Sequence, residues 1–314
     1  MLAAVLSVLT IFLIIGVGFV LTQRGVFDEA TGRLFTLTVM FVALPPMMVY
    51  ELTHGFTRLE LLHAGRALLI PIGSYIGCQL LAPLVARASG VPVGRRGTFT
   101  AMFVASNTIF IGMPVNLALF GTASVPSVLL SYVVNSTYFW TLGAHAIESD
   151  TGRHFPLFSW DHLKKILSPQ FLALLVGVAL VFLGVRLPGF LASAMKQLGA
   201  MTTPLSLLFM GITFAGVTLA EIRPTRDMLG LFFGRFLLAP ALVYAVYLLI
   251  PVPPLMVKVF MIQAAMPAIT QAALVAKHCD ADYRYATVMV SATNLASLAV
   301  LPLYMALFSV LFPA

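Results

Sequence analysis

Hydrophobic residues run along this chain in long blocks that short polar stretches separate. A helix that crosses a bilayer needs roughly 20 mostly apolar residues, because each residue rises about 1.5 Å through a core about 30 Å thick. Ten blocks meet this requirement: 2–22, 34–52, 65–86, 98–120, 125–146, 169–186, 191–219, 229–250, 255–276 and 284–311. The pattern predicts an all-α integral membrane protein with ten transmembrane helices.

The composition agrees with this prediction. Of 314 residues, 60% are hydrophobic and 9% are charged, whereas a soluble domain carries about 25% charged residues. A soluble enzyme, a nucleic-acid-binding protein and a disordered chain are therefore excluded. Cys78 and Cys279 stand far apart, which gives no evidence for a disulfide framework or a metal site. No HExxH, GxSxG or P-loop motif occurs, so we expect neither an enzyme nor a cofactor.

Basic residues are distributed unequally between the two sets of connections. The odd-numbered connections hold 13 of the 18 lysines and arginines, among them Arg95, Arg96 and Arg235. The positive-inside rule then places these connections in the cytoplasm and both termini outside it, in the plasma (inner) membrane of the cell. The longest polar connection, a central cytoplasmic loop at 148–168, separates a first repeat (1–147) from a second (169–314). Five helices in each repeat require an inverted arrangement.

A short motif recurs in the two repeats. The third block begins Arg66-Ala-Leu-Leu-Ile-Pro71, and the eighth begins Arg235-Phe-Leu-Leu-Ala-Pro240. The Gly73-x-x-x-Gly77 spacing and a second one at 230–234 permit close contact between helices, and we interpret both as packing motifs.

Prolines interrupt the fourth and ninth blocks. Gly112 and Pro114 lie in the fourth, and Met266 and Pro267 lie in the ninth. Proline inside a membrane helix kinks or breaks it. We therefore expect helices four and nine to be broken and to cross, as in secondary transporters that bind substrate near the membrane midplane.

The polar residues near these breaks are neutral. They are Ser106, Asn107, Thr108, Asn116, Gln263, Thr270 and Gln271. No acidic residue lies within a predicted helix centre, and no lysine or arginine is expected at the centre either. Amide groups together with the positive N-terminal ends of half-helices suit an anion, particularly a carboxylate. The alternative is that these residues only join helices or satisfy the broken backbone.

Three stretches of the sequence resemble the auxin efflux carrier family. They are Ser106-Asn-Thr-Ile-Phe-Ile-Gly-Met-Pro114, Gly234-Arg-Phe-Leu-Leu-Ala-Pro240 and Gln263-Ala-Ala-Met-Pro267. The likeness covers nearly the whole chain. The central loop of about 20 residues is short, as in bacterial relatives of this family.

The resemblance implies a scaffold domain and a moving transport domain, each drawn from both repeats, and a homodimer in the lipid bilayer. It also implies that Asn107 holds the carboxylate of an organic anion. Gln170 stands where the family has an asparagine, and Asn135 stands where it has a glutamine. Both changes keep an amide and alter its reach by one methylene, which puts auxin itself in doubt.

We therefore predict an elevator-type permease for a small organic anion, either an auxin-like monocarboxylate or a malate- or malonate-type acid. The predicted substrate-binding residues are Asn107, Asn135, Gln170, Ser106, Thr108 and Gln271. Two alternatives stay open at this point. One is a sodium-coupled symporter of the bile-acid type, and the other is a membrane receptor that binds a ligand without transporting it.

Overall fold

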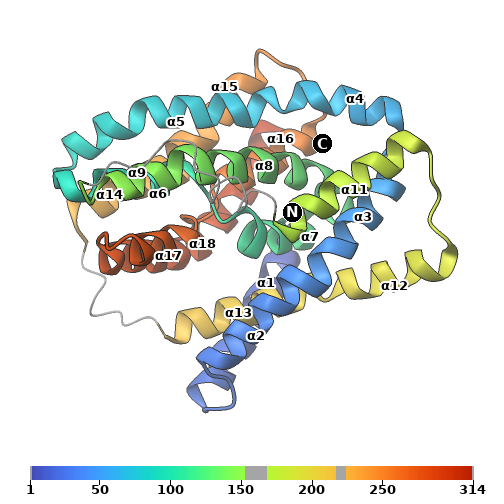
Figure 1. The fold of residues 1–314 in the computed structure, drawn as a ribbon, viewed down its shortest axis with the longest axis horizontal. Helices are drawn as coiled ribbons and strands as arrows, with labels where there is room; N and C mark the ends of the chain where they lie inside the picture. The colour runs from blue at the N-terminus through green and yellow to red at the C-terminus, as the bar shows by residue number, and fades with distance from the viewer. Residues whose placement is uncertain (1, 153–167, 217–223, 313–314) are drawn as a thin grey trace. The chain divides into compact units, whose positions relative to one another are not determined.

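A computed structural model describes residues 2–152, 168–216 and 224–312 of the chain. Throughout these ranges the regular structure is helical, apart from one isolated bridge between extended residues (Figure 1). The all-helical prediction is confirmed. Most of the predicted central loop, at 153–167, lies outside the described residues.

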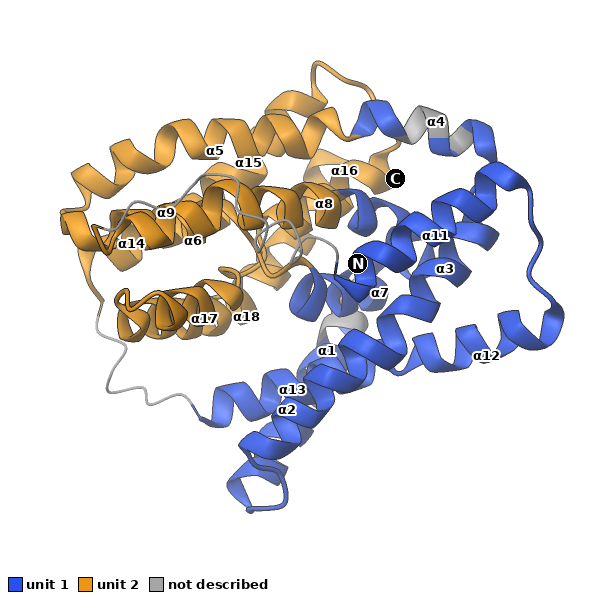
Figure 2. Ribbon diagram, in the orientation of Figure 1, with its two compact units in different colours: residues 1–67, 109–130, 167–217 blue, residues 68–108, 131–166, 218–314 orange. Residues whose placement is uncertain are grey.

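The chain forms two compact units, which Figure 2 shows in different colours. Unit 1 contains residues 1–67, 109–130 and 167–217, and unit 2 contains residues 68–108, 131–166 and 218–314. Each unit therefore takes segments from both halves of the sequence.

Unit 1 is a set of helices joined by short connections. Its helices are α1 (Leu2–Gln23), α2 (Glu29–Thr38), η1 (Val39–Ala43), α3 (Leu44–Gly55), α4 (Arg58–Ala67), α7 (Met113–Phe120), η4 (Thr122–Ser124), α11 (Pro169–Leu183), α12 (Gly189–Ala200) and α13 (Thr202–Ala215). Helix α1 packs along α13, and α3 packs against α11 and α12. A Cβ atom at Gly211 of α13 would meet the backbone of α1 at Ile15 and Phe19, so glycine permits this close approach.

Unit 2 contains the ninth predicted segment and the first part of the fourth, up to Thr108. Its helices are α5 (Leu69–Ala88), η2 (Val93–Arg95), α6 (Arg96–Val104), η5 (Phe139–Gly143), α9 (Ala144–Ser149), α14 (Arg226–Phe233), η7 (Gly234–Leu238), α15 (Ala239–Tyr247), α16 (Pro254–Ala264), α17 (Gln271–His278) and α18 (Tyr283–Leu311). Helices α8 (Val125–Tyr138) and η3 (Thr108–Gly112) pass from one unit to the other.

The glycine motif of α5 is a packing motif, as predicted. A Cβ atom at Gly73 would lie 2.9 Å from Val246, and one at Gly77 would lie 2.9 Å from Leu242. Both neighbours belong to α15, so the two glycines let α5 and α15 pack closely. In the second motif, a Cβ atom at Gly234 would likewise meet the ring of Phe103, which belongs to α6.

Helices occupy the described parts of all ten predicted segments. Within the described ranges, five helices are long and apolar enough to cross a membrane by themselves: Glu29–Gly55, Gly65–Ala88, Gly189–Ala215, Arg226–Tyr247 and Tyr283–Leu311. The others are shorter or interrupted. Ten crossings in a five-plus-five inverted repeat remain a prediction.

The fourth and ninth segments are both interrupted. The first interruption, at 105–107, lies ahead of Gly112 and Pro114 rather than at them. The second, at 265–270, contains Met266 and Pro267. Pro114 lies in the first turn of α7, directly after the π-turn η3.

Two other π-turns precede a proline in the same way. Helix α3 begins after η1 with Pro45 and Pro46 in its first turn, and α15 begins after η7 with Pro240. A proline lacks the N–H group of an α-helical bond, and its ring crowds the carbonyl of the preceding turn. The wider π-turn accommodates both effects, so these prolines lie in continuous helices.

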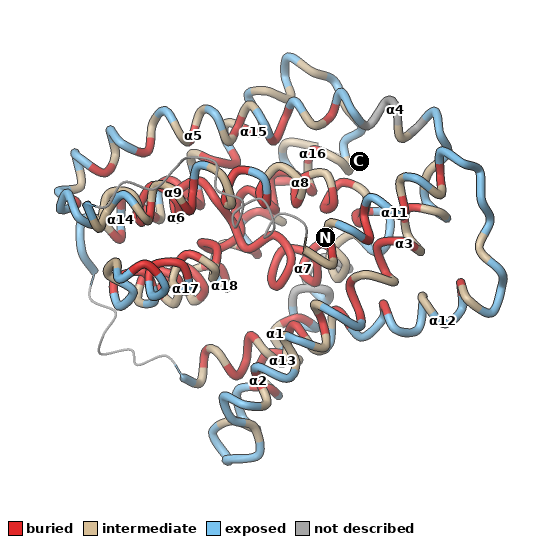
Figure 3. Tube along the Cα trace, viewed as in Figure 1, coloured by how far each residue is buried: buried red, intermediate tan, exposed pale blue. Residues whose placement is uncertain are grey.

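Long stretches of the two interrupted segments are buried throughout (Figure 3). Every residue from 98 to 116 is buried, and so is every residue from 259 to 269. A helix that is buried on all sides can place its polar groups only against protein. These segments are therefore the candidate location of a binding site.

Candidate functional site

The two interruptions pair with each other inside unit 2. Ser106 and Ala268 form an antiparallel bridge. Next to it, the N–H of Asn107 donates to the carbonyl oxygen of Pro267 at 2.9 Å, and the N–H of Ile269 donates to that of Ala105 at 3.2 Å. We call this pair of segments, residues 105–107 and 265–270, the crossover. Backbone groups that have no partner within their own helix at the break thus form hydrogen bonds with the other interrupted segment.

Arg235 completes the backbone hydrogen bonding around the crossover. Its Nε donates to Met266, its Nη1 to Phe103 and Val104, and its Nη2 to Ala264 and Met266, at 2.5–3.2 Å. All five N–H groups of the guanidinium are engaged. Three of the four acceptors are carbonyl oxygens at the C-terminal ends of α6 and α16, which have no partner within their own helices, and the fourth, that of Met266, lies just beyond α16.

This position of Arg235 corrects the sequence interpretation, which counted the residue with a cytoplasmic connection and expected no arginine at the centre. Arg235 lies in the apolar helix Arg226–Tyr247 and is only 1% exposed. Without it, the basic residues still favour the odd connections by 12 to 5. Its counterpart in the repeated motif, Arg66, is exposed.

The charge of Arg235 is balanced by backbone dipoles. Each helix C-terminus carries about half a negative charge, so the ends of α6 and α16 together match one guanidinium. Burying this cation costs several kcal/mol, which hydrogen bonds from a charged donor at about 1.5–3 kcal/mol each can offset. Arg235 and the C-terminal ends of α6 and α16 thus neutralise one another. They leave the positive N-terminal ends of η3 and α17, the helices that follow the crossover, without a balancing negative charge.

Asn107 and Thr270 lie where those two helices begin. Asn107 directly precedes η3, and Thr270 directly precedes α17. The Nδ2 of Asn107 donates to the hydroxyl oxygen of Thr270 at 3.0 Å, and Asn107 is only 4% exposed. The residues that directly precede these two helices therefore meet through a buried amide and a hydroxyl. Such an arrangement is suited to bind a negatively charged group.

Asn135 holds the first interruption from α8. Its Oδ1 accepts from the N–H of Ser106 at 2.9 Å and from the hydroxyl of Tyr75 at 2.6 Å. Its Nδ2 donates to the hydroxyl oxygen of Thr108 at 3.3 Å. The side chain therefore binds the backbone of Ser106 and the hydroxyl of Thr108, the two neighbours of Asn107. Positioning of Asn107 is the role that these contacts support.

Two glutamines near the second interruption carry unpaired acceptors. Gln263 donates through Nε2 to the carbonyl oxygen of Thr108 at 3.3 Å. Its Oε1, and the Oε1 of Gln271 at the start of α17, are buried and meet no donor among the described residues. A ligand with a hydroxyl group, a water molecule or a cation could bind to such oxygens.

The predicted site residues are divided between the units. Ser106, Asn107, Thr108 and Asn135 come together in unit 2 through the contacts above, and Gln271 begins α17 in the same unit. Gln170 belongs to unit 1, where it is 3% exposed and donates to the carbonyl oxygen of Met40 at 2.9 Å.

Two participants were not predicted from the sequence, Arg235 and Tyr75. Arg235 gave a usable signal, because an arginine recurs at the start of a proline-containing motif in both repeats. Tyr75 gave none, since a tyrosine in an apolar helix is an ordinary packing residue.

Comparison with known proteins gives a consistent result. A family model described as "Membrane transport protein" matches residues 3–305. An uncharacterized transporter of Methanocaldococcus jannaschii is 21% identical over 312 residues, covering 95% of this chain and 96% of the relative. Another uncharacterized transporter, of Methanothermobacter thermautotrophicus, is 23% identical over 305 residues, with the same coverage. This is the auxin efflux carrier family, so the resemblance found in the sequence is confirmed.

Proposed function

The chain belongs to the membrane transport protein family, and we propose that it is a secondary transporter of a small organic anion that binds at the crossover. The observation that carries this proposal is the meeting of Asn107 and Thr270 in front of two helix N-termini. Each terminus contributes about half a positive charge. Together they match one carboxylate.

In the proposed bound state, the carboxylate accepts hydrogen bonds from the Asn107 amide and from N–H groups in the first turn of α17. Asn135 keeps Ser106 and Thr108 in position, and Arg235 keeps the preceding helix ends in place. Because all five Arg235 donors bind carbonyls, a second carboxylate would find no basic partner there. This favours a monocarboxylate over a malate- or malonate-type acid.

We assign the transport domain to unit 2 and the scaffold to unit 1, with alternating access through movement of the transport domain. The division of the chain into two units that each combine segments of both repeats supports this assignment. Gln170 then belongs to the scaffold. A homodimer in the plasma (inner) membrane, with both termini outside the cytoplasm, completes the proposal.

The test is uptake of radiolabelled mono- and dicarboxylates into proteoliposomes. We expect saturable uptake of at least one monocarboxylate, and we expect Asn107→Ala to reduce it by roughly tenfold or more, as for loss of a hydrogen bond to a charged group. Asn116→Ala is the matched control, because Asn116 is a buried asparagine of α7 that donates to Gly112 of its own segment. Equal uptake by Asn107→Ala and wild type would place the substrate elsewhere.

A sodium-coupled symporter of the bile-acid type is the second candidate. The unpaired oxygens of Gln263 and Gln271 favour it, because amide oxygens are ligands of hard cations. Uptake in the same proteoliposomes that requires a sodium gradient would support this candidate. Carboxylate binding without any flux would instead support a receptor.

A further inference from the structure

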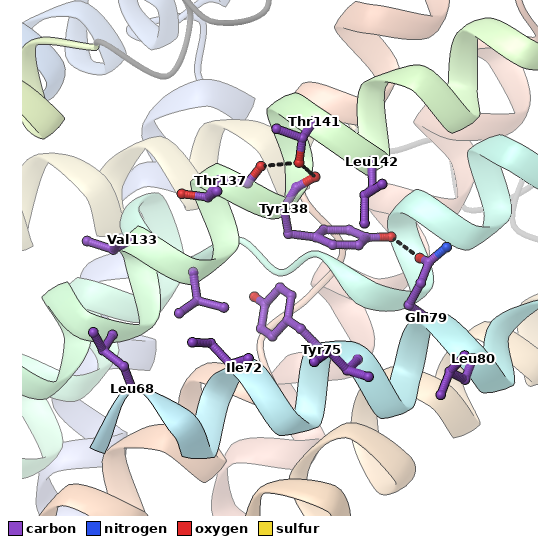
Figure 4. A pocket seen from close by; sticks show the side chains of 12 residues that line it. Leu68, Ile72, Tyr75, Gln79, Leu80, Val133, Thr137, Tyr138, Thr141 and Leu142 are labelled. Atoms are coloured by element: carbon purple, nitrogen blue, oxygen red, sulfur yellow. Dashed lines mark hydrogen bonds between the residues drawn. The ribbon is translucent and has the colours of Figure 1, made fainter. Parts of the chain in front are cut away.

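Unit 2 also contains a cavity of about 400 Å³ beside the crossover. It lies between α5 and the segment formed by α8 and η5 (Figure 4). Side chains such as Leu68, Ile72, Leu80, Val133 and Leu142 line it, and none of its lining residues is charged. Its volume falls in the range of small-molecule sites, about 300–1,000 Å³.

Three hydroxyl groups in the lining already have partners. The hydroxyl of Tyr138 donates to Gln79 at 2.5 Å, the hydroxyl of Tyr75 donates to Asn135 at 2.6 Å, and the hydroxyl of Thr141 donates to its own helix. The cavity therefore presents aromatic rings and methyl groups. A polar occupant would lose hydrogen bonds to water there without gaining any from these hydroxyls.

The mouth of the cavity is part of a membrane-facing surface. Ile76 is 56% exposed and Leu80 is 69% exposed, and both belong to α5 in the helix Gly65–Ala88, which is long and apolar enough to cross a membrane. In a bilayer, such a surface is in contact with hydrocarbon. The cavity is therefore continuous with the surface of α5 that lipid covers.

We propose that an acyl chain of a bilayer phospholipid occupies this cavity. An acyl chain is uncharged, needs no hydrogen bonds and is present at the mouth. A helix from a second copy of the chain, about 10–12 Å across with its side chains, is too wide for a space of this volume.

The occupant would touch a side chain that positions the candidate substrate site. The ring of Tyr75 forms part of the cavity wall and packs edge-to-face on Tyr138, with ring centroids 5.5 Å apart. Its hydroxyl reaches Asn135, which binds the backbone N–H of Ser106 and the hydroxyl of Thr108 on either side of Asn107. An acyl chain in the cavity supplies the packing contacts that keep the Tyr75 ring in this orientation.

The test is photo-crosslinking in vesicles of phosphatidylcholine that contain a phosphatidylcholine with a diazirine in its acyl chain. Adducts are mapped on peptides of the full-length protein. We expect adducts on lining residues of both walls, including Tyr75 and Val133. Adducts confined to the mouth residues Ile76 and Leu80, or spread evenly over the exposed face of α5, would overturn the proposal.

Cavity-filling variants provide the control. Thr137→Trp should lower the yield of adducts on the inner residues by roughly tenfold. The larger ring excludes about two methylenes of the acyl chain from the cavity, and each buried methylene changes the binding constant about fourfold. Val133→Phe is a second filling variant in case the first does not fold. Leu84→Trp adds the same ring to an exposed site of α5 outside the cavity and should leave the yield unchanged. An unchanged yield in a folded filling variant would contradict the proposal. Because crosslinking does not depend on transport, this result is separate from the test of the proposed function.

Discussion

Replacement of Arg235 by methionine tests how the crossover is held together. The variant keeps an apolar side chain of similar length and removes all five hydrogen bonds, leaving four buried carbonyl oxygens without a partner. Each unpaired group costs about 1–3 kcal/mol. The sum is reduced because the variant no longer buries a cation, which itself costs several kcal/mol. We expect a net destabilisation of about 3–5 kcal/mol, as when one partner of a buried charged network is removed.

The assay is thermal unfolding of the purified protein in one detergent. Arg66→Met is the matched control, because Arg66 holds the same place in the repeated motif but is exposed. Its effect should stay within about 0.5 kcal/mol. Arg235→Lys keeps the charge but offers three donors in place of five, so its stability should lie between wild type and Arg235→Met. If Arg235→Met unfolds at the same temperature as wild type, the reasoning about the helix ends is wrong.

Three further predictions concern the start of α6 and the membrane topology. Burial raises the pKa of Asp150, although hydrogen bonds from Thr98 and Gly97 oppose the shift. The folded protein then holds this proton more tightly than the unfolded one, so stability should fall as pH rises above about 3.8, the ordinary pKa of an aspartate. Thermal unfolding measured against pH checks this, and Asp150→Asn should remove the dependence. Gly97→Ala should destabilise by about 1–3 kcal/mol, because its Cβ would overlap the backbone of α9, whereas Gly94→Ala, with its nearest neighbour at 3.6 Å, should have little effect on thermal unfolding. A reporter fused after Ala314 should be detected outside the cytoplasm, and a cytoplasmic signal would reverse the predicted orientation.

The helices were predictable because the membrane requires long apolar segments. Helices occupy the described parts of all ten predicted segments, and the interruption of the fourth and ninth was expected from their prolines. The location of the first break was not predictable from proline alone, because the π-turn η3 accommodates Pro114 within a helix. The break falls instead at Ala105 to Asn107, where the backbone bonds to the second interrupted segment.

The candidate site was predictable only in part. Neutral polar residues in apolar segments identified Ser106, Asn107 and Asn135, since such side chains must find partners inside the protein. The sequence did not indicate that Asn135 positions its neighbours through Ser106. Arg235 was assigned to a connection because a charge normally lies outside the hydrocarbon. Its partners are carbonyl groups on two other helices, and only the folded structure brings them together.

The most direct measurement is the equilibrium affinity of the protein for a transported carboxylate, compared between wild type and Asn107→Asp. The substitution keeps the shape of the side chain and can place a negative charge in front of the N-terminus of α17. If the anion binds there, affinity should fall by roughly a hundredfold, since like charges in a buried site repel by several kcal/mol. Unchanged affinity in the folded variant would contradict an anion site at the crossover.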